Sequence, residues 1–162
     1  MLKDYTKNGK YTKDLPQSFS ARIKKQVRNK KNKNLVSGVI KAVLSEFDPK
    51  KDYVTTTRNW RLSRFLSVSK IIKIKLRTCG SICAVVAAVL RKIGLAVKLV
   101  DGKLCKDGEW RRHAWLEVKY DKGGQFIPFD PFSPGFHLTK KHRKVATFAD
   151  WSEMEEVVSK KI

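Results

Sequence analysis

One uninterrupted apolar run constrains the fold of this chain more than any other feature, because it has to be buried. The run extends from Ile82 to Leu90 and contains only Ile, Cys, Ala, Val and Leu. Thr78-Cys79-Gly80-Ser81 precedes it, and Lys92-Ile93-Gly94 follows it. A glycine directly after the last apolar positions is a typical helix C-cap, and no proline interrupts the run. We therefore predict one buried helix that begins at or near Cys79.

The predicted position of Cys79 at the start of this helix has a chemical consequence. The unpaired N–H groups of the first turn and the positive end of the helix dipole favour a thiolate over a thiol. A cysteine inside an apolar helix experiences the opposite effect. We therefore predict that Cys79 is a nucleophile near neutral pH.

Three other segments place apolar residues at helical spacing. Their predicted bounds are Ser18 or Ser20 to about Asn29, Asn34 to Asp48-Pro49, and Ser67 to Leu76, with Ser18 or Ser20 and Asn34 as caps. A β-prone stretch, Tyr53 to Thr57, lies between the last two segments. A final helix is predicted from about Trp151 to Lys160, with Ser152 and Glu155 as a capping box.

After Gly94 the apolar period changes to two, which predicts strands. The predicted strands are Leu95–Val100, Leu104-Cys105, Trp110–Tyr120 and Gln125–Asp130. The turns between them are predicted at Asp101-Gly102, Asp107-Gly108 and Asp121–Gly124. The sheet is predicted to end at Pro131, Pro134 and Gly135. Helices followed by a meander of strands predict an α+β domain with helices packed on one face of an antiparallel sheet. The chain divides into a basic arm and helix (1–33) and a catalytic domain (34–162) within one compact unit.

The hairpin around Lys122-Gly123 supplies a possible base for Cys79. If Asp121 faces Gly124, the residue numbers of each pair across the hairpin add up to 245. Trp115 then lies opposite Asp130. His113 then shares a face with Trp115 and is a diagonal neighbour of Asp130, with backbones about 7–8 Å apart. A slip of one residue would put His113 and Asp130 on opposite faces. In this register, Asp130 accepts from one imidazole nitrogen while the other faces Cys79.

Residues from about Ser67 to Ser133 resemble the transglutaminase-like superfamily of cysteine enzymes, a branch of the papain-like fold. The segments that carry the resemblance are Thr78-Cys79-Gly80-Ser81, Leu90-Arg91-Lys92-Ile93-Gly94-Leu95, His113-Ala114-Trp115-Leu116-Glu117-Val118 and Ile127-Pro128-Phe129-Asp130-Pro131. Each segment is weak evidence alone, but their order and spacing together are specific. The resemblance implies a triad of Cys79 as nucleophile, His113 as general base and acid, and Asp130 as the residue that orients His113.

The resemblance also helps to assign the remaining residues near the site. In the family, the arginine of the helix-ending element lies about twelve residues after the nucleophile, which fits Arg91 with Cys79 and makes Cys83 a packing residue. Trp60 and Asn59 are candidates to complete the oxyanion site, although no motif fixes them and each could be an ordinary packing or loop residue. Trp115 either shields the thiolate–imidazolium pair from water or belongs to the core.

The chain carries 36 Lys and Arg against 15 Asp and Glu, a formal net charge of +21. This excess is typical either of a surface for nucleic acid, anionic membranes or acidic partners, or of a lysine-rich solvated surface. The densest cluster, Lys24 to Lys33, includes the polar face of the first predicted helix, which could bind an anionic partner or simply face water.

The three cysteines are an odd number, and the Met1-Leu2-Lys3-Asp4 start shows no apolar leader, which favours free thiols in a cytoplasmic protein. The longest apolar run is too short to span a bilayer. No Cys-x-x-Cys pair is present, so we predict neither a metal site nor a cofactor. His137 and His142, in a basic and turn-rich tail, are predicted to be solvated.

The sequence thus predicts a cysteine enzyme that attacks a carboxamide or peptide carbonyl through a thioester at Cys79. Hydrolysis of a protein or peptide substrate, as by a protease or amidase, is favoured because no calcium-site carboxylate clusters are present. The alternatives are a protein-glutamine acyltransferase that cross-links or deamidates, an acyltransferase with a small thioester donor, and a non-enzymatic basic module that binds nucleic acid or another anionic partner.

Overall fold

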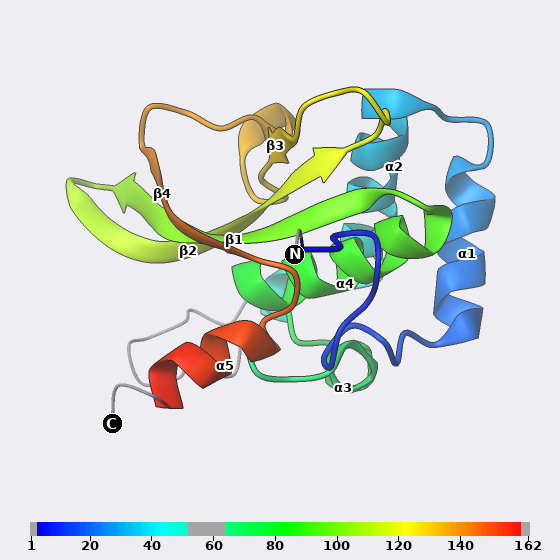
Figure 1. Cartoon of the computed structure of the whole chain (residues 1–162), viewed down its shortest axis with the longest axis horizontal. Coiled ribbons are helices and arrows are strands. Elements are labelled where there is room, and N and C mark those ends of the chain that lie inside the picture. The colour runs from blue at the N-terminus through cyan, green and yellow to red at the C-terminus, as the bar shows by residue number, and fades with distance from the viewer. Residues whose placement is uncertain (1–2, 52–63, 160–162) are drawn as a thin grey trace.

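The computed structural model describes residues 3–51 and 64–159 (Figure 1). The α-helices are α1 (Gln17–Val27), α2 (Asn32–Ser45), α3 (Val68–Ile74), α4 (Cys79–Ile93) and α5 (Ser152–Ser159), with short 3-10 helices η1 (Pro49–Lys51) and η3 (Pro134–Phe136). The strands are β1 (Ala96–Lys106), β2 (Glu109–Lys119), β3 (Ile127–Phe129) and β4 (His142–Phe148). They form an antiparallel sheet in the order β3-β2-β1-β4. The predicted α+β class is confirmed.

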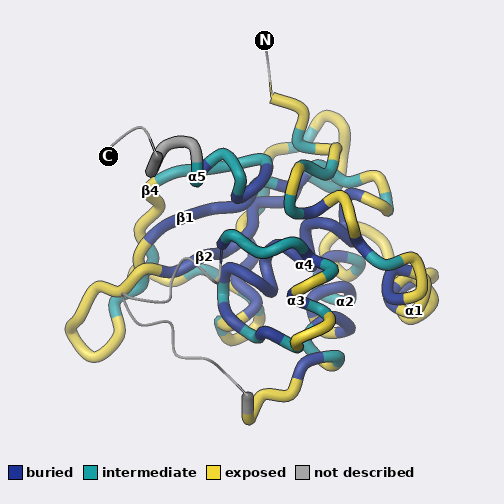
Figure 2. The backbone as a smooth tube through the Cα atoms, turned by 90° about the horizontal axis from the view of Figure 1, so that it is seen from below, coloured by how far each residue is buried: buried dark blue, intermediate teal, exposed yellow. Residues whose placement is uncertain are grey.

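Helix α4 lies at the centre of the described structure. It packs on β1 and β2, while α1, α2 and α3 pack on α4, so that α4 lies between the sheet and these three helices (Figure 1). Every residue from Ile82 to Leu90 is fully buried, and Figure 2 shows the same buried character along the neighbouring strands. The helix ends at Ile93, and its C-cap Gly94 has a φ of 104°, the left-handed conformation that favours glycine. The predicted buried helix is therefore confirmed at both ends.

The helix starts predicted for α1 and α2 were wrong. Helix α1 begins at Gln17, because Pro16 at its N-cap has a fixed φ and its carbonyl accepts from the Ser20 N–H at 3.0 Å. Ser18 and Ser20 lie inside the helix. Similarly, the N-cap of α2 is Lys31 rather than Asn34. The predicted apolar face of α1 is nevertheless buried, and at α3 the cap is Ser67, whose hydroxyl accepts from the Lys70 N–H.

The predicted turn at Asp101-Gly102 is wrong, because β1 continues through these residues as one strand. A β-bulge against β4 lies between them. A Cβ on Gly102 would lie 2.3 Å from the Trp115 ring and 2.5 Å from the Arg143 carbonyl oxygen. Glycine is therefore required here by close approach rather than by a turn. The turn at Asp107-Gly108 is real, and both residues have positive φ.

The predicted register between β2 and β3 is confirmed. Leu116 pairs with Phe129 and Val118 with Ile127, so that each pair sums to 245. The Gly124 N–H donates to the Asp121 carbonyl at 3.1 Å, which closes the predicted turn. This register aligns His113 and Asp130 on the same face of the sheet.

The sheet does not close at Pro131–Gly135 as predicted, because β4 adds an edge strand alongside β1. The sequence of β4 is rich in basic residues and only partly buried, which hides its strand character. The capping box of the last helix also differs from the prediction. The Asp150 carboxylate accepts from the Ser152 N–H, and the Glu153 carboxylate accepts from the Asp150 N–H.

Residues 5–12, near the start of the described structure, are tied to the domain by buried polar groups. The Asp150 carboxylate accepts from the backbone N–H of Tyr11 and from the hydroxyl of the fully buried Thr12. The buried Arg91 side chain, from the helix-ending element, donates to the carbonyls of Tyr5, Val97 and Ala149. Arg91 therefore joins the N-terminal arm, β1 and the β4–α5 connection.

Candidate active site

Cys79 is the first residue of α4, and the local sequence fixes this start. The Thr78 hydroxyl accepts from the Ser81 N–H at 3.1 Å, and the Ser81 hydroxyl accepts from the Thr78 N–H at 2.9 Å. This reciprocal cap satisfies two backbone donors at the helix end and leaves the half-buried Cys79 side chain at the surface of the core. One turn later, Cys83 is fully buried, and burial raises the pKa of its thiol well above the ordinary value.

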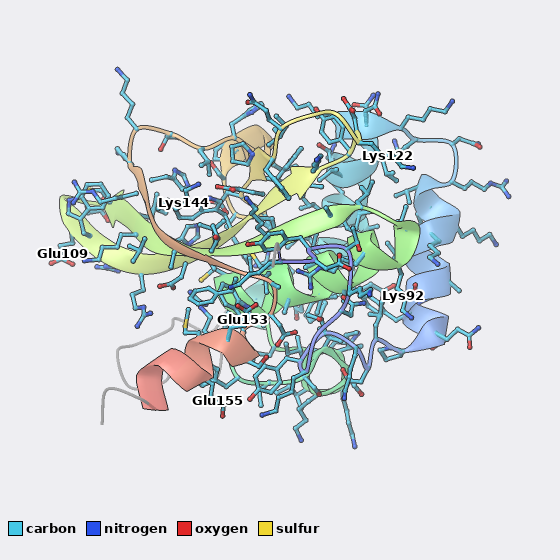
Figure 3. The ribbon with its side chains drawn as sticks, in the orientation of Figure 1. Lys92, Glu109, Lys122, Lys144, Glu153 and Glu155 are labelled. Atoms are coloured by element: carbon cyan, nitrogen blue, oxygen red, sulfur yellow. The ribbon has the colours of Figure 1, made fainter. Side chains whose placement is uncertain are left out.

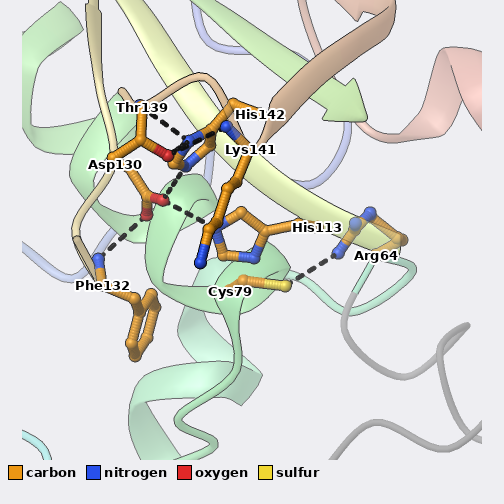
Figure 4. A network of polar contacts seen from close by, with 8 residues as sticks. All are labelled: Arg64, Cys79, His113, Asp130, Phe132, Thr139, Lys141 and His142. Carbon is orange, nitrogen blue, oxygen red and sulfur yellow. Dashed lines mark hydrogen bonds and ion pairs between the residues drawn. The ribbon is translucent and has the colours of Figure 1, made fainter. Parts of the chain in front are cut away.

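His113 and Asp130 meet in front of Cys79 (Figure 4). Strand β2 carries His113, and Asp130 directly follows β3. The Nε2 atom of His113 lies 2.7 Å from Oδ2 of Asp130, and both side chains are buried. The Phe132 N–H donates to the other carboxylate oxygen at 2.9 Å. Because Nε2 faces Asp130, Nδ1 is the ring nitrogen available for the hydrogen bond of His113 with Cys79.

Hydrogen bonds and charges set the protonation of this group. Burial raises the pKa of the Cys79 thiol, but a hydrogen bond with His113 and the neighbouring positive charges together bring the pKa to about 6. Burial lowers the pKa of His113, whereas hydrogen bonds and charges of Asp130 and Cys79 raise it to about 9. Burial raises the pKa of Asp130, but its hydrogen bond with His113 keeps it below its ordinary value. At neutral pH the site therefore holds a thiolate, an imidazolium and a carboxylate.

Arg64 is a charged neighbour of the sulfur that the sequence did not reveal. Its Nη1 atom lies 3.9 Å from Cys79 Sγ, and its Nη2 atom lies 3.3 Å from Oδ1 of Asp101. Arg112 binds the other oxygen of Asp101 at 3.1 Å, and the Arg64 guanidinium lies over the Trp151 ring at 4.7 Å. A buried positive charge at this distance stabilises the thiolate. One arginine among 36 basic residues gives no sequence signal, and the Asp101 anchor was interpreted as a turn.

His142 is a second residue that the sequence analysis placed wrongly. It was predicted to be solvated, but its side chain is only 3% exposed, and its Nε2 lies 2.7 Å from Oδ2 of Asp130. Strand β4, which the sequence pattern did not reveal, begins at His142 and brings it to the site. His137, by contrast, is exposed as predicted.

The three predicted oxyanion or substrate residues have different outcomes. Trp60 and Asn59 lie outside the described residues. Trp115 is 1% exposed and lies edge-on to His142, with ring centroids 5.4 Å apart, and 6.2 Å from the ring of His113. Its indole nitrogen is buried and has no hydrogen-bond partner in the described part of the chain. Trp115 therefore packs its apolar rings beside the imidazoles of His113 and His142.

One cluster in the described ranges has the composition of a metal site. His113, Asp130 and His142 each offer a ligand atom, and these atoms lie within 4.8 Å of one another. Two imidazoles and one carboxylate suit several transition metals. The same atoms are hydrogen-bonded to one another at 2.7 Å, so that a metal would have to displace the protons between them.

Side chains project into solvent from α1 (Figure 3). Its basic residues are exposed, whereas its large apolar residues are buried. Arg22 pairs with Glu46 of the neighbouring segment, and its guanidinium also lies near the Phe19 ring. Within residues 3–51 and 64–159, no helix combines the length and the apolar character needed to cross a membrane.

Comparisons with known proteins agree with this geometry. Residues 7–131 match the family described as the Transglutaminase-like superfamily. A search of curated proteins found no relative. Among solved structures, the chain is similar to a protein from Cytophaga hutchinsonii described as a candidate cysteine protease, with a TM-score of 0.68 and 17% sequence identity. The alignment covers 92% of this chain and 47% of that protein, so the chain spans about half of its length.

The likeness to the solved structure concerns the fold, whereas the family match covers most of the chain and includes Cys79, His113 and Asp130. Together with the predicted motifs and the mixed helical and antiparallel architecture, it shows that this chain belongs to the transglutaminase-like superfamily.

Proposed function

We propose that the protein is a cysteine hydrolase that cleaves a carboxamide or peptide bond through a thioester at Cys79. The observation that supports this most strongly is the thiolate–imidazolium pair at the start of α4. The sulfur has a pKa of about 6, and its partner His113 is hydrogen-bonded to Asp130 at 2.7 Å. Such a pair is nucleophilic and carries a proton for the leaving group at the same pH.

The reaction follows from these positions. The Cys79 sulfur attacks the carbonyl carbon and forms a C–S bond, while the carbonyl oxygen becomes an oxyanion near the N–H groups of the first turn of α4. As the C–N bond breaks, His113 gives its proton to the departing amine. A water molecule then attacks the thioester, His113 accepts the water proton, and the carboxylic acid leaves as the sulfur returns to thiolate. Asp130 orients the imidazole in both steps.

Hydrolysis and acyl transfer share the thioester and differ only in the acceptor. A protein-glutamine acyltransferase would use an amine where the hydrolase uses water. The C. hutchinsonii structure described as a candidate cysteine protease favours the hydrolase. A protein or peptide substrate and a cytoplasmic location are further parts of the proposal.

A mixture of cellular peptides and a fluorescent primary amine tests this proposal. The full chain should produce new peptide termini, and acid quenching should trap an acylated protein by intact mass. The matched Cys79→Ala variant should do neither. Fluorescent labelling of glutamine side chains in excess of hydrolysis would instead identify an acyltransferase.

A basic binding module is the second candidate, because the solvent face of α1 carries Arg22, Lys24 and Lys25, and its exposed C-cap residue is Arg28. It predicts tight binding to nucleic acid or anionic vesicles that weakens steeply with added salt. Such binding, combined with an unreactive Cys79 and no product in the peptide assay, would overturn the hydrolase.

A further inference from the structure

Asp130 accepts hydrogen bonds from two imidazoles at a single oxygen (Figure 4). The Nε2 atoms of His113 and His142 each lie 2.7 Å from its Oδ2 atom. Its Oδ1 atom accepts from the Phe132 N–H at 2.9 Å. A triad needs only one of these imidazoles, so the second requires its own explanation.

The partners of His142 determine which of its ring nitrogens carries a proton. Its Nδ1 atom lies 3.0 Å from the backbone nitrogen of Thr139, which can only donate. Nδ1 therefore accepts and has no proton, and the proton of the neutral ring lies on Nε2, where it points at Asp130. The Thr139 hydroxyl also lies 3.1 Å from Nδ1, and that hydroxyl accepts from the Lys141 N–H at 3.2 Å.

Backbone groups of the turn from Thr139 to His142 also fix the position of the His142 ring. The His142 N–H donates to the Thr139 carbonyl at 3.1 Å, while the Thr139 N–H donates to the His142 ring. The edge of the Trp115 ring closes the remaining side. A side chain fixed in this way provides a preorganised donor at a constant position.

This arrangement separates a hydrogen-bonding role from a metal-binding role. A metal bound at Nε2 of His142 would require a lone pair there, and the ring proton would then move to Nδ1. That proton would face the Thr139 N–H, so two donors would oppose each other at 3.0 Å. The backbone of Thr139 thus favours a hydrogen bond from His142 to Asp130 over a metal ligand.

We infer that His142 is a positioning residue for the proposed reaction: its fixed Nε2–H, together with the Phe132 N–H, orients the Asp130 carboxylate toward His113. The inference rests on the proposed function of Cys79 and His113. His142 touches neither the sulfur nor the substrate in this role. It acts through Asp130, and the imidazole of His113 keeps its alignment with Cys79 because the carboxylate cannot rotate away.

Nitrogen-15 NMR of histidine-labelled protein tests the tautomer directly, and the chain has only three histidines to assign. At neutral pH, His142 should show a protonated Nε2 and an unprotonated Nδ1, and the His142→Gln spectrum assigns its signals by difference. A proton on Nδ1 would overturn the inference. So would saturable zinc binding that shifts the signals of both His113 and His142, because that result identifies a metal centre.

The positioning role is tested by the pH midpoint of Cys79 alkylation by iodoacetamide, which requires no substrate. We expect His142→Leu to raise this midpoint by about one pH unit, since the loss of a charge-assisted hydrogen bond frees Asp130 and weakens the pairing of His113 with the sulfur. His142→Gln, which keeps an N–H donor, should bring the midpoint most of the way back. A wild-type midpoint in His142→Leu with unchanged His113 signals would overturn the inference. Failure of the wild type to turn over peptides leaves both readouts intact and counts only against the proposed hydrolase.

Discussion

Replacement of His113 by Asn should raise the pKa of Cys79 from about 6 to its ordinary value of 9.0 or higher. The imidazolium supplies a hydrogen bond and a positive charge to the sulfur, and without it the burial that raises the pKa remains. Three pKa units correspond to about 4 kcal/mol of stabilisation of the thiolate. At pH 7 the thiolate fraction would fall from about nine-tenths to about one-hundredth.

The assay is the pH dependence of alkylation by iodoacetamide, with Cys79 followed by peptide mass spectrometry. The rate at a single pH is a poor readout, because a less basic thiolate is also a weaker nucleophile, and the rate at pH 7 should therefore fall only about fourfold. The midpoint of the pH profile carries the full shift of three units. Cys83 serves as an internal control, since burial should keep it unlabelled throughout.

His137→Asn provides the matched control, because His137 is exposed. Its profile should keep the wild-type midpoint near 6. A midpoint that stays near 6 in His113→Asn would refute the reasoning. The thiolate would then owe its stability to the helix start and Arg64, and His113 would not be its partner.

Three further changes have defined outcomes. The turnover of the proposed hydrolase should have a bell-shaped dependence on pH. Activity should fall below about pH 6, where Cys79 gains a proton, and above about pH 9, where His113 loses the proton that the leaving group needs. Activity that stays constant across either of these pH ranges would contradict the thiolate–imidazolium pair. Arg64→Gln should raise the alkylation midpoint of Cys79 by about one unit, because it removes a positive charge 3.9 Å from the sulfur and leaves burial unchanged; a downward shift would contradict this role. Gly102→Ala should lower the free energy of unfolding by about 2 kcal/mol, measured by urea denaturation, since its Cβ would overlap Trp115, and an unchanged midpoint would show that the bulge adapts.

The features that the sequence predicted well are set by local patterns. The apolar run and its flanking Thr78 and Gly94 are enough to define α4, because capping and burial act over a few residues. The pairing of His113 with Asp130 follows from one turn and the alternation of side chains along strands. These inferences need no knowledge of distant parts of the chain.

The features that were missed depend on contacts between distant segments. Asp101-Gly102 is compatible with both a turn and a bulged strand, and only the neighbouring β4 decides between them. His142 reaches the site because it lies on β4, and Arg64 reaches it from the few described residues before α3. Neither residue lies in a local pattern that distinguishes it from the many basic residues of this chain.

The bond from the Trp151 indole N–H to the Gly80 carbonyl, 3.0 Å long, links the segment after β4 to the first turn of α4. The family match ends at residue 131, well before Trp151 and His142. A fragment cut at that boundary would retain all three proposed triad residues. It would lose His142, which contacts Asp130, and Trp151, which contacts both Arg64 and Gly80. The candidate site thus draws on contacts from residues beyond the part of the sequence by which the family is recognised.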